Sequence, residues 1–274
     1  MDRKIVHIVG TGTIGEPLIG LFCDYRDQLG IDGITFQKNS ALMGDRSKVL
    51  DLMDRGARLA VDEEKVHDFK KLNMDPDFET EEAIKRAMVV IDCTPRGIGH
   101  VNKNLYYEKF AGDVKGFLAQ GSEDGFGKKY ARGINDQALD ANDQFIQIVS
   151  CNTHNISCIT DVLAVNNDPD NLVEGKYVCI RRANDLSQET GFIPSPQVGT
   201  HTDEKYGSHH AKDSAALFHT LGMDLNLFSS AMKVNSQYMH ILWFNLQVKE
   251  PTSITKIKER LYANERVAMT RKDL

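Results

Sequence analysis

A glycine-rich turn near the start of the chain constrains the fold most. The segment Lys4–Val9, KIVHIV, is apolar and rich in β-branched residues, which predicts a buried strand. It leads directly into Gly10–Gly15, GTGTIG, and then into a helical pattern over Pro17–Leu29. Glycines placed in this way allow a tight turn and a close backbone approach to a pyrophosphate at a helix start. We therefore predict a dinucleotide-binding fold rather than a turn of structural purpose only.

The end of the second strand bears on which dinucleotide binds. After the strand Gly33–Gln37 an NAD-specific site usually carries an acid, about 20 residues beyond the glycines. Here residues 35–40 read TFQKNS and contain no acid. Lys38 could instead attract a 2′-phosphate, which favours NADP or at least allows it. The alternative is that Lys38 is a solvated loop cation.

Strands and helices alternate through the first half of the chain. Thr94 and Pro95 follow one strand and Gly121 follows the next, and open α/β sheets bind ligands at such carboxyl ends. We therefore predict a Rossmann-type, doubly wound parallel sheet within residues 1–150. The later strand patterns are Ala57–Val61, Met88–Cys93, Asp113–Ala119 and Phe145–Val149.

The second half, residues 151–274, has a different pattern. Two strand patterns, Asn226–Asn235 and Tyr238–Lys249, follow each other without a helix between them. Consecutive strands imply an antiparallel or mixed sheet, so we predict an α+β second domain. A chain of 274 residues is long enough for two domains.

Cys151 is the candidate nucleophile. It follows the strand Phe145–Val149, and Asn152 and Thr153 are residues that favour a helix start. The positive end of a helix dipole favours the thiolate form. The alternative is an inert buried cysteine. The five cysteines show no paired spacing, so we expect neither a zinc site nor disulfides, and no other metal.

Composition excludes several classes of protein. A net charge of −6 argues against a protein that coats nucleic acid. No apolar run reaches the roughly 18 residues that a membrane span needs. No basic segment followed by an apolar run opens the sequence, so we expect a cytoplasmic protein without nucleic-acid or membrane partners.

Histidines and arginines of the second half suggest an anion site. His240 lies in the apolar segment YMHILWFNLQV, where an imidazole needs a partner or a task. It is either catalytic or a hydrogen-bonded core histidine. His209 and His210, with Arg181 and Arg182, either form an anion pocket or belong to a solvated basic face.

The ordered motifs resemble the archaeal-type (type II) glyceraldehyde-3-phosphate dehydrogenases over nearly the whole chain. The matching segments are GTGTIG, DCTPRGIG, QGSE, IVSCN, IRRAND, SHHAKD and MKVNSQYMHILWFNLQVKEP. The resemblance implies an NAD(P)-binding Rossmann domain, residues 1–150, and an α+β catalytic domain with a mostly antiparallel sheet, residues 151–274.

The resemblance also implies the reaction. Glyceraldehyde 3-phosphate would be oxidised and phosphorylated to 1,3-bisphosphoglycerate with NADP or NAD as the cofactor, and Lys38 favours NADP. Cys151 would form a thiohemiacetal and then a thioester, His240 would act as the base, and inorganic phosphate would release the product. A cytoplasmic homotetramer working in glycolysis or gluconeogenesis is expected.

The binding residues come from both sources. The motifs themselves point to Gly10, Gly12, Gly15, Lys38, Thr94 and Pro95 for the dinucleotide, and to His209 and His210 for an anion. The resemblance adds Thr13, Ile14, Gly121 and Arg182 at the dinucleotide. For the substrate it implies Ser150, Asn152, His210 and Ala211, with Thr153 and Arg181 helping at the phosphate sites.

The sequence departs from the family at several positions. His154 stands where the family usually has Thr, and Leu242 where it has a second histidine. Family members also continue beyond the helix predicted from Ser253, so either this sequence is truncated or the protein lacks the C-terminal part of the family's fold. These departures favour two alternatives: the same mechanism on a different phosphorylated aldehyde or semialdehyde, or a non-catalytic dinucleotide-binding homologue.

Overall fold

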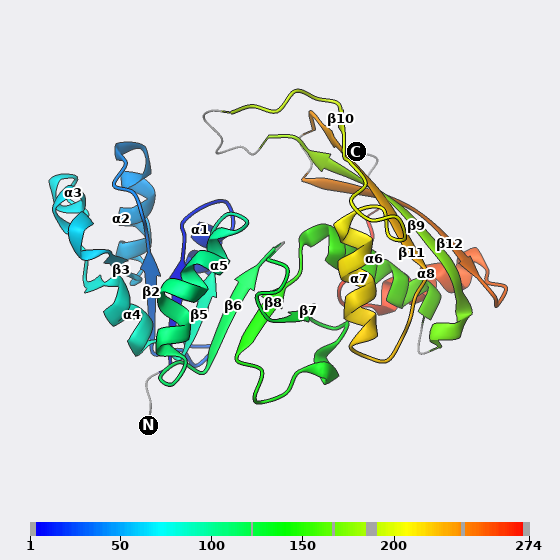
Figure 1. Ribbon diagram of the computed structural model, residues 1–274, viewed down its shortest axis with the longest axis horizontal. Helices are drawn as coiled ribbons and strands as arrows, with labels where there is room; N and C mark the ends of the chain where they lie inside the picture. The colour runs from blue at the N-terminus through cyan, green and yellow to red at the C-terminus, as the bar shows by residue number, and fades with distance from the viewer. Residues whose placement is uncertain (1–3, 122, 166–167, 185–190, 237–238, 271–274) are drawn as a thin grey trace. The chain divides into compact units, whose positions relative to one another are not determined.

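The computed structural model describes residues 4–121, 123–165, 168–184, 191–236 and 239–270, and it divides into two compact units (Figure 1). The first unit comprises Met1–Lys128 and Ala141–Ile148. The second comprises Lys129–Asp140 and Val149–Leu274. Lys129–Asp140 therefore packs with the second unit, although the sequence alone suggested a single boundary after residue 150.

The first unit contains a parallel sheet of Rossmann type, as the sequence predicted. The sheet has the strand order β4-β3-β2-β1-β5-β6-β8-β7. All of these strands belong to the first unit except most of β7, whose residues Lys129 and Tyr130 are assigned to the second unit. The pairs from β4 through β8 are parallel, and the order reverses direction at β1, where such folds bind ligands. The strands are β1 (Ile5–Val9), β2 (Gly33–Gln37), β3 (Arg58–Val61), β4 (Phe78–Glu79), β5 (Val89–Asp92), β6 (Gly116–Gln120), β7 (Lys128–Tyr130) and β8 (Phe145–Ile148).

The apolar runs form strands because both of their faces are covered. Every residue of β1 is buried, and Ile8, Phe36 and Leu59 are fully buried in one core cluster. His7 is also fully buried, and its Nδ1 lies 2.7 Å from the hydroxyl of Thr35. The helices are α1 (Gly15–Asp24), α2 (Arg46–Asp54), α3 (Val66–Lys71), α4 (Thr80–Arg86) and α5 (Ile98–Asn102).

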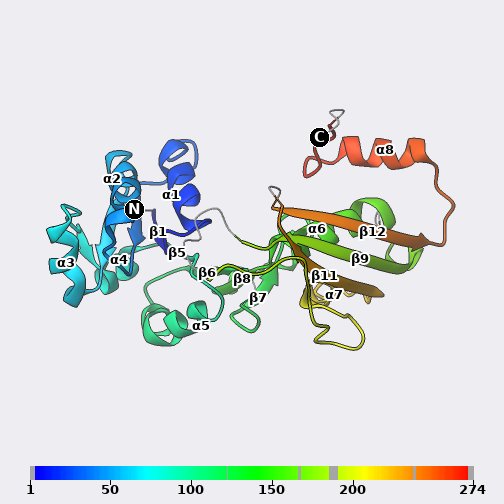
Figure 2. The same cartoon turned by 90° about the horizontal axis from the view of Figure 1, so that it is seen from above.

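The second unit contains a mixed sheet in the order β10-β11-β9-β12. The β11–β9 pair is parallel and the other two pairs are antiparallel, which agrees with the α+β prediction. Figure 2 shows β9, β11 and β12 side by side. These strands are β9 (Leu172–Arg182), β10 (Gln197–Val198), β11 (Leu227–Val234) and β12 (His240–Val248).

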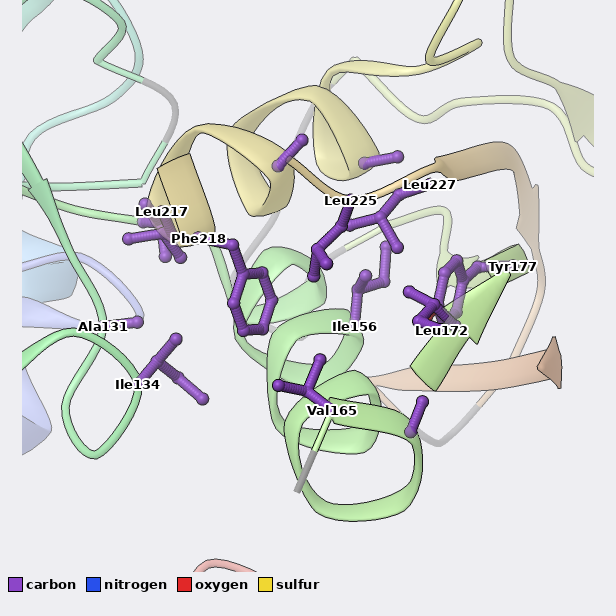
Figure 3. Close-up of a cluster of buried hydrophobic side chains, with 14 of the residues drawn as sticks. Ala131, Ile134, Ile156, Val165, Leu172, Tyr177, Leu217, Phe218, Leu225 and Leu227 are labelled. Carbon is purple, nitrogen blue, oxygen red and sulfur yellow. The ribbon is translucent and has the colours of Figure 1, made fainter. Parts of the chain in front are cut away.

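Two helices, α6 (Cys151–Thr160) and α7 (His209–His219), form the core of this unit together with the sheet. The two helices approach each other closely where both carry a small residue: the hydroxyls of Ser157 and Ser214 lie 2.7 Å apart. Phe218 points from α7 toward α6 (Figure 3). A third helix, α8 (Ile254–Ala263), follows β12. None of the described helices has the length and apolar character needed to cross a membrane.

Candidate active site

The start of α6 places Cys151 at the first position of a helix. Ser150 is extended, with φ −65° and ψ 157°, and its hydroxyl accepts a hydrogen bond from the Thr153 N–H at 3.4 Å. The His154 N–H donates to the Ser150 carbonyl at 2.9 Å, which closes the first helical turn. Ser150 thus serves as the N-cap and fixes the backbone of the cysteine that follows it.

The Cys151 thiol is less acidic than the sequence argument expected. Cys151 is exposed at the surface, but the protein around its sulfur excludes enough water to raise the thiol pKa above its usual value. The Asn152 N–H and the charge of Arg181 act in the opposite direction and do not outweigh desolvation. The helix start thus favours the thiolate, as expected, but desolvation has the larger effect on the thiol pKa, so the thiol needs a base.

Strands β9 and β12 bring two basic side chains to the same sheet position. His240 pairs with Arg181 across the antiparallel ladder. Side chains directly opposite each other in such a ladder lie on one face. The Nε of Arg181 is buried and forms no hydrogen bond with any residue that the structure describes. This guanidinium therefore has a donor available to a ligand.

His210 comes to the same region from α7. It is 1% exposed, and its Nδ1 lies 3.3 Å from the Ser150 hydroxyl. Burial, then the positive charges of His209, Arg181 and His240, lower the pKa of His210 to about 3. The ring is consequently neutral at physiological pH, and its Nε2 is buried without a hydrogen-bond partner in the described part of the chain.

Three of the buried side-chain atoms without a hydrogen-bond partner in the described ranges belong to residues predicted to bind substrate, and others lie on His7, Glu123 and Gln147 of the first unit. Besides Arg181 Nε and His210 Nε2, the Oδ1 of Asn152 is buried without a partner among the described residues. Buried polar atoms are nearly always hydrogen-bonded in native proteins. Such atoms on Asn152, Arg181 and His210 are what a site filled by a polar ligand would leave in its absence.

Other predicted substrate residues are engaged within the protein. Thr153 is fully buried and its hydroxyl lies 3.0 Å from that of Ser150. The Ala211 N–H donates to the hydroxyl of Ser229 at 3.0 Å. Ser229, on β11, was missed by the sequence reasoning, because nothing local marks a strand serine that anchors a distant helix. The His209 ring centroid lies 3.9 Å from that of His210.

Arg182 does not join this cluster. Successive side chains of a strand point to opposite faces of the sheet, so Arg182 lies on the face opposite Arg181. Its predicted role at the dinucleotide belongs to a residue of the second unit, whereas the other predicted dinucleotide residues belong to the first.

The glycine turn of the first unit has the geometry that a pyrophosphate needs. Gly10 has φ +95° and its N–H donates to the Gln37 carbonyl at 3.0 Å. A Cβ on Gly15 would lie 1.9 Å from the Gly10 carbonyl oxygen, so only glycine fits there. A Cβ on Gly12 would meet nothing within 4 Å, so this position faces open space. The residues therefore fit a dinucleotide whose phosphates approach the backbone closely.

Two buried acids hold the loop that follows β5, beside the glycine turn. Asp92 is 2% exposed and accepts a hydrogen bond from the Thr94 N–H at 2.9 Å. Glu123, also 2% exposed, accepts one from the Gly97 N–H at 2.5 Å. Sequence reasoning did not assign either acid a role. Thr13, Ile14, Pro95 and Gly121 also lie in these turns, while Ser122 of the QGSE motif is outside the described residues.

Lys38 is not the solvated cation that one reading of the sequence allowed. It is 7% exposed, and its Nζ donates to Asp45 Oδ2 at 2.5 Å and to Thr11 Oγ1 at 3.4 Å. The acid that seemed absent after β2 is therefore supplied by Asp45, from the short turn Met43–Asp45. No sequence pattern links this aspartate to the end of β2.

Two residues that differ from the motifs of the resembled family, His154 and Leu242, line one pocket. His154 and Leu242 both face a cavity of about 810 Å³ within the second unit. His154 Nδ1 lies 3.3 Å from the Val149 carbonyl, and burial lowers the pKa of His154. The lining is completed by Arg132, Gly133, Ile134, Asp136, Asn155, Cys158, Ile159, Phe244 and 265–268. Among the described residues, no group of three or more His, Cys, Asp or Glu side chains is arranged to hold a metal ion.

Comparison with known proteins gives one consistent set of relatives. No protein-family model matches the chain. The glyceraldehyde-3-phosphate dehydrogenase of Methanobacterium formicicum is 29% identical over 272 residues, which is 97% of this chain and 74% of the relative. That of Methanobacterium bryantii is 26% identical, and glyceraldehyde-3-phosphate dehydrogenase 2 of Methanosarcina acetivorans 29% identical, with the same two coverages.

Proposed function

We propose that this chain, which these matches support as a member of the archaeal-type glyceraldehyde-3-phosphate dehydrogenase family, is a phosphorylating NAD(P)-dependent aldehyde dehydrogenase. Its substrate is glyceraldehyde 3-phosphate and its product is 1,3-bisphosphoglycerate. The observation that carries the proposal is the arrangement around Cys151. A cysteine at a helix start shares one compact unit with Arg181, His210 and His240. Arg181 Nε and His210 Nε2 are buried and have no hydrogen-bond partner among the described residues.

The raised thiol pKa assigns a task to His240. Because Cys151 is mostly a thiol at neutral pH, a base must take its proton before the sulfur attacks the aldehyde carbon. The base returns that proton to the carbonyl oxygen as the thiohemiacetal forms, and it takes the proton back from the hydroxyl when the hydride leaves. His240 lies opposite Arg181 on the strand ladder, and the charge of Arg181 acts on the Cys151 thiol.

The start of α6 stabilises the oxygen of the reacting carbonyl. The Thr153 N–H is already occupied by Ser150, so the N–H groups of Cys151 and Asn152 are left at the helix start for the developing oxyanion. Arg181 supplies a buried guanidinium for a phosphate group, as substrate or as the attacking inorganic phosphate. Phosphate oxygen then bonds to the thioester carbon as the carbon–sulfur bond breaks, which returns the Cys151 thiolate.

The first unit holds the dinucleotide. Gly12 leaves room for the pyrophosphate, Gly10 and Gly15 allow the tight turn around it, and Lys38 lies at the end of β2 where the adenosine ribose is recognised. When bound, the nicotinamide supplies the acceptor for the hydride that leaves the thiohemiacetal carbon. We propose NADP as the preferred cofactor.

The experiment is a nucleotide-reduction assay with glyceraldehyde 3-phosphate, run with NADP or NAD and with or without inorganic phosphate. We expect reduced nucleotide to accumulate in proportion to time only when phosphate is present. Without phosphate, the reaction stops after about one turnover, with the acyl group on Cys151. Nucleotide binding without any reduction would reject the proposal and leave a non-catalytic homologue.

A second candidate keeps this mechanism and changes the aldehyde. It is favoured by His154 and Leu242, which replace the usual residues and line the same pocket. The substrate would then be another phosphorylated aldehyde or a semialdehyde. An aldehyde panel decides: a kcat/KM for glyceraldehyde 3-phosphate far above that of every other aldehyde rejects this candidate.

We also propose a homotetramer that works in the cytoplasm, in glycolysis or gluconeogenesis. The outer face of the β9–β12 sheet leaves Ile241 46% and Trp243 55% exposed. Side chains of this size are usually covered by a partner when they share one sheet face. Light scattering coupled to size-exclusion chromatography gives the mass; a monomer at all concentrations contradicts the tetramer.

A further inference from the structure

A network of ion pairs joins the loop after β2 to the glycine turn and the start of α1. Lys38 Nζ contacts Thr11 of the glycine turn at 3.4 Å and Asp45 Oδ2 at 2.5 Å. The other oxygen of Asp45 lies 2.9 Å from Lys48 Nζ, and Lys48 lies 3.5 Å from Glu16 in the first turn of α1. The ion-pair network therefore lies where a Rossmann fold holds the phosphates and adenosine ribose of its ligand.

The formal charges of the four residues in this ion-pair network cancel. Two lysines face two carboxylates, and the Lys38 side chain is only 8% exposed. A buried ammonium needs a counter-ion, and in the free protein that counter-ion is Asp45. Burial alone would raise the pKa of Asp45, but the hydrogen bonds and charges of Lys38 and Lys48 lower it by more. The net pKa is below the usual value, so the carboxyl is ionised at neutral pH.

We propose that Asp45 determines how the protein distinguishes a ribose 2′-hydroxyl from a 2′-phosphate, by competing as an internal anion for Lys38. A 2′-hydroxyl can donate a hydrogen bond to the Asp45 carboxylate. A 2′-phosphate must take Lys38 from Asp45 and remain beside its negative charge. Lys38 alone would favour NADP strongly, and Asp45 reduces that preference. The inference rests on the proposed dinucleotide site.

The test uses the adenosine halves of the two cofactors, so that it does not depend on catalysis. Isothermal titration compares 5′-AMP with 2′,5′-ADP on the wild type and on Asp45→Asn. Removing one negative charge beside a 2′-phosphate should tighten 2′,5′-ADP binding on the order of tenfold, after allowing for solvent screening. The affinity for 5′-AMP should change less than about twofold, because that ligand carries no 2′-phosphate.

Asp68→Asn is the matched control. Asp68 pairs with Lys71 at 3.0 Å on the same unit, so this variant removes the same charge from another lysine pair. It should leave the ratio of the two affinities unchanged. In the double variant Lys38→Met/Asp45→Asn, the tenfold gain should disappear, because the lysine that holds the 2′-phosphate is gone.

A variant in the opposite direction covers the case in which Asp45→Asn does not fold. Lys48 is only partly buried, and Lys48→Met leaves the whole charge of Asp45 facing Lys38. This change should weaken 2′,5′-ADP several-fold and leave 5′-AMP unaffected. Equal effects on both ligands, in either variant, overturn the inference alone. If neither ligand nor the whole dinucleotides bind the wild type, the proposed function fails first.

Discussion

The two strand-to-helix junctions of this protein, β1 to α1 and β8 to α6, differ in how the backbone at the helix start is capped. Both helices have 10 residues. At α1 the N-cap is Ile14, and no described side chain caps the helix; at α6 the Ser150 hydroxyl accepts from the third residue. The glycine junction thus leaves its helix start without a cap from a described side chain, whereas the serine junction caps its helix with a hydroxyl and presents the Cys151 side chain.

The difference teaches how each junction depends on its residues. The glycine junction depends on the absence of side chains, because a Cβ on Gly15 would overlap Gly10. The serine junction depends on particular side-chain atoms, namely the Ser150 hydroxyl and the Cys151 sulfur. Substitutions should therefore harm the first through shape and fold, and the second through chemistry with little change in fold.

The largest effect is expected for Cys151→Ser. A serine hydroxyl is a far weaker nucleophile here, so turnover should fall on the order of a thousandfold or more. Dinucleotide binding, which belongs to the other junction, should be unchanged. Steady-state kinetics and a nucleotide titration measure the two. Cys23→Ser, at a half-buried cysteine of α1, is the control and should keep full activity.

Gly15→Ala tests the glycine junction. The new methyl cannot fit at 1.9 Å from the Gly10 oxygen, so the turn must shift. We expect the free energy of unfolding to fall by about 2 kcal/mol or more, with loss of dinucleotide binding. Gly12→Ala has room and should cost less than about 0.5 kcal/mol while still blocking the ligand. Chemical denaturation and titration separate them; equal stability losses would contradict this.

The sequence predicted those features of the fold that depend on a local pattern of residues. The buried β1, the glycine turn and the start of α6 after Phe145–Val149 could be anticipated because each depends on neighbours in the chain. The predicted helix Pro17–Leu29 was too long, since α1 ends at Asp24 and turns lead to Gly30 at φ +63°.

Contacts between distant segments could not be anticipated. Asp45 reaches Lys38, and Ser229 orders the first turn of α7, without any pattern that connects the segments. The raised pKa of the Cys151 thiol was also missed, because desolvation depends on the packing of α6 against the sheet, which a helix-dipole argument ignores. Predictions that rest on solvent exclusion therefore needed the structure.

Each unit also carries one deeply buried histidine, and this pair predicts acid sensitivity. Burial lowers the pKa of His7 to about 3, and burial with neighbouring cations does the same for His210. Below an unfolded pKa of about 6.5, the unfolded chain takes up protons that the folded chain does not, so stability falls as pH decreases toward 3.

The slope should be about 1.4 kcal/mol per pH unit for each histidine within that window. Denaturation curves measured between pH 7 and about pH 4 give it. His7→Gln and His210→Gln should each remove about one histidine's share, while His219→Gln, on an exposed side chain, should not. A pH dependence that both variants leave intact would rule out these two groups as its source.

Ser150→Ala should have the smallest effect and sharpens the contrast between the junctions. Loss of the cap on α6 should reduce stability by about 1 kcal/mol, and Ser150→Gly should cost less. Because His210 also loses the hydroxyl at 3.3 Å, turnover should fall more than stability implies, through misplacement of His210 and the Cys151 backbone. Ser150→Thr keeps a hydroxyl and should recover most of the stability and most of the turnover.

If Ser150→Ala lowers stability but leaves kcat and KM unchanged, the cap serves the fold alone, and Cys151 is positioned by its packing rather than by the serine.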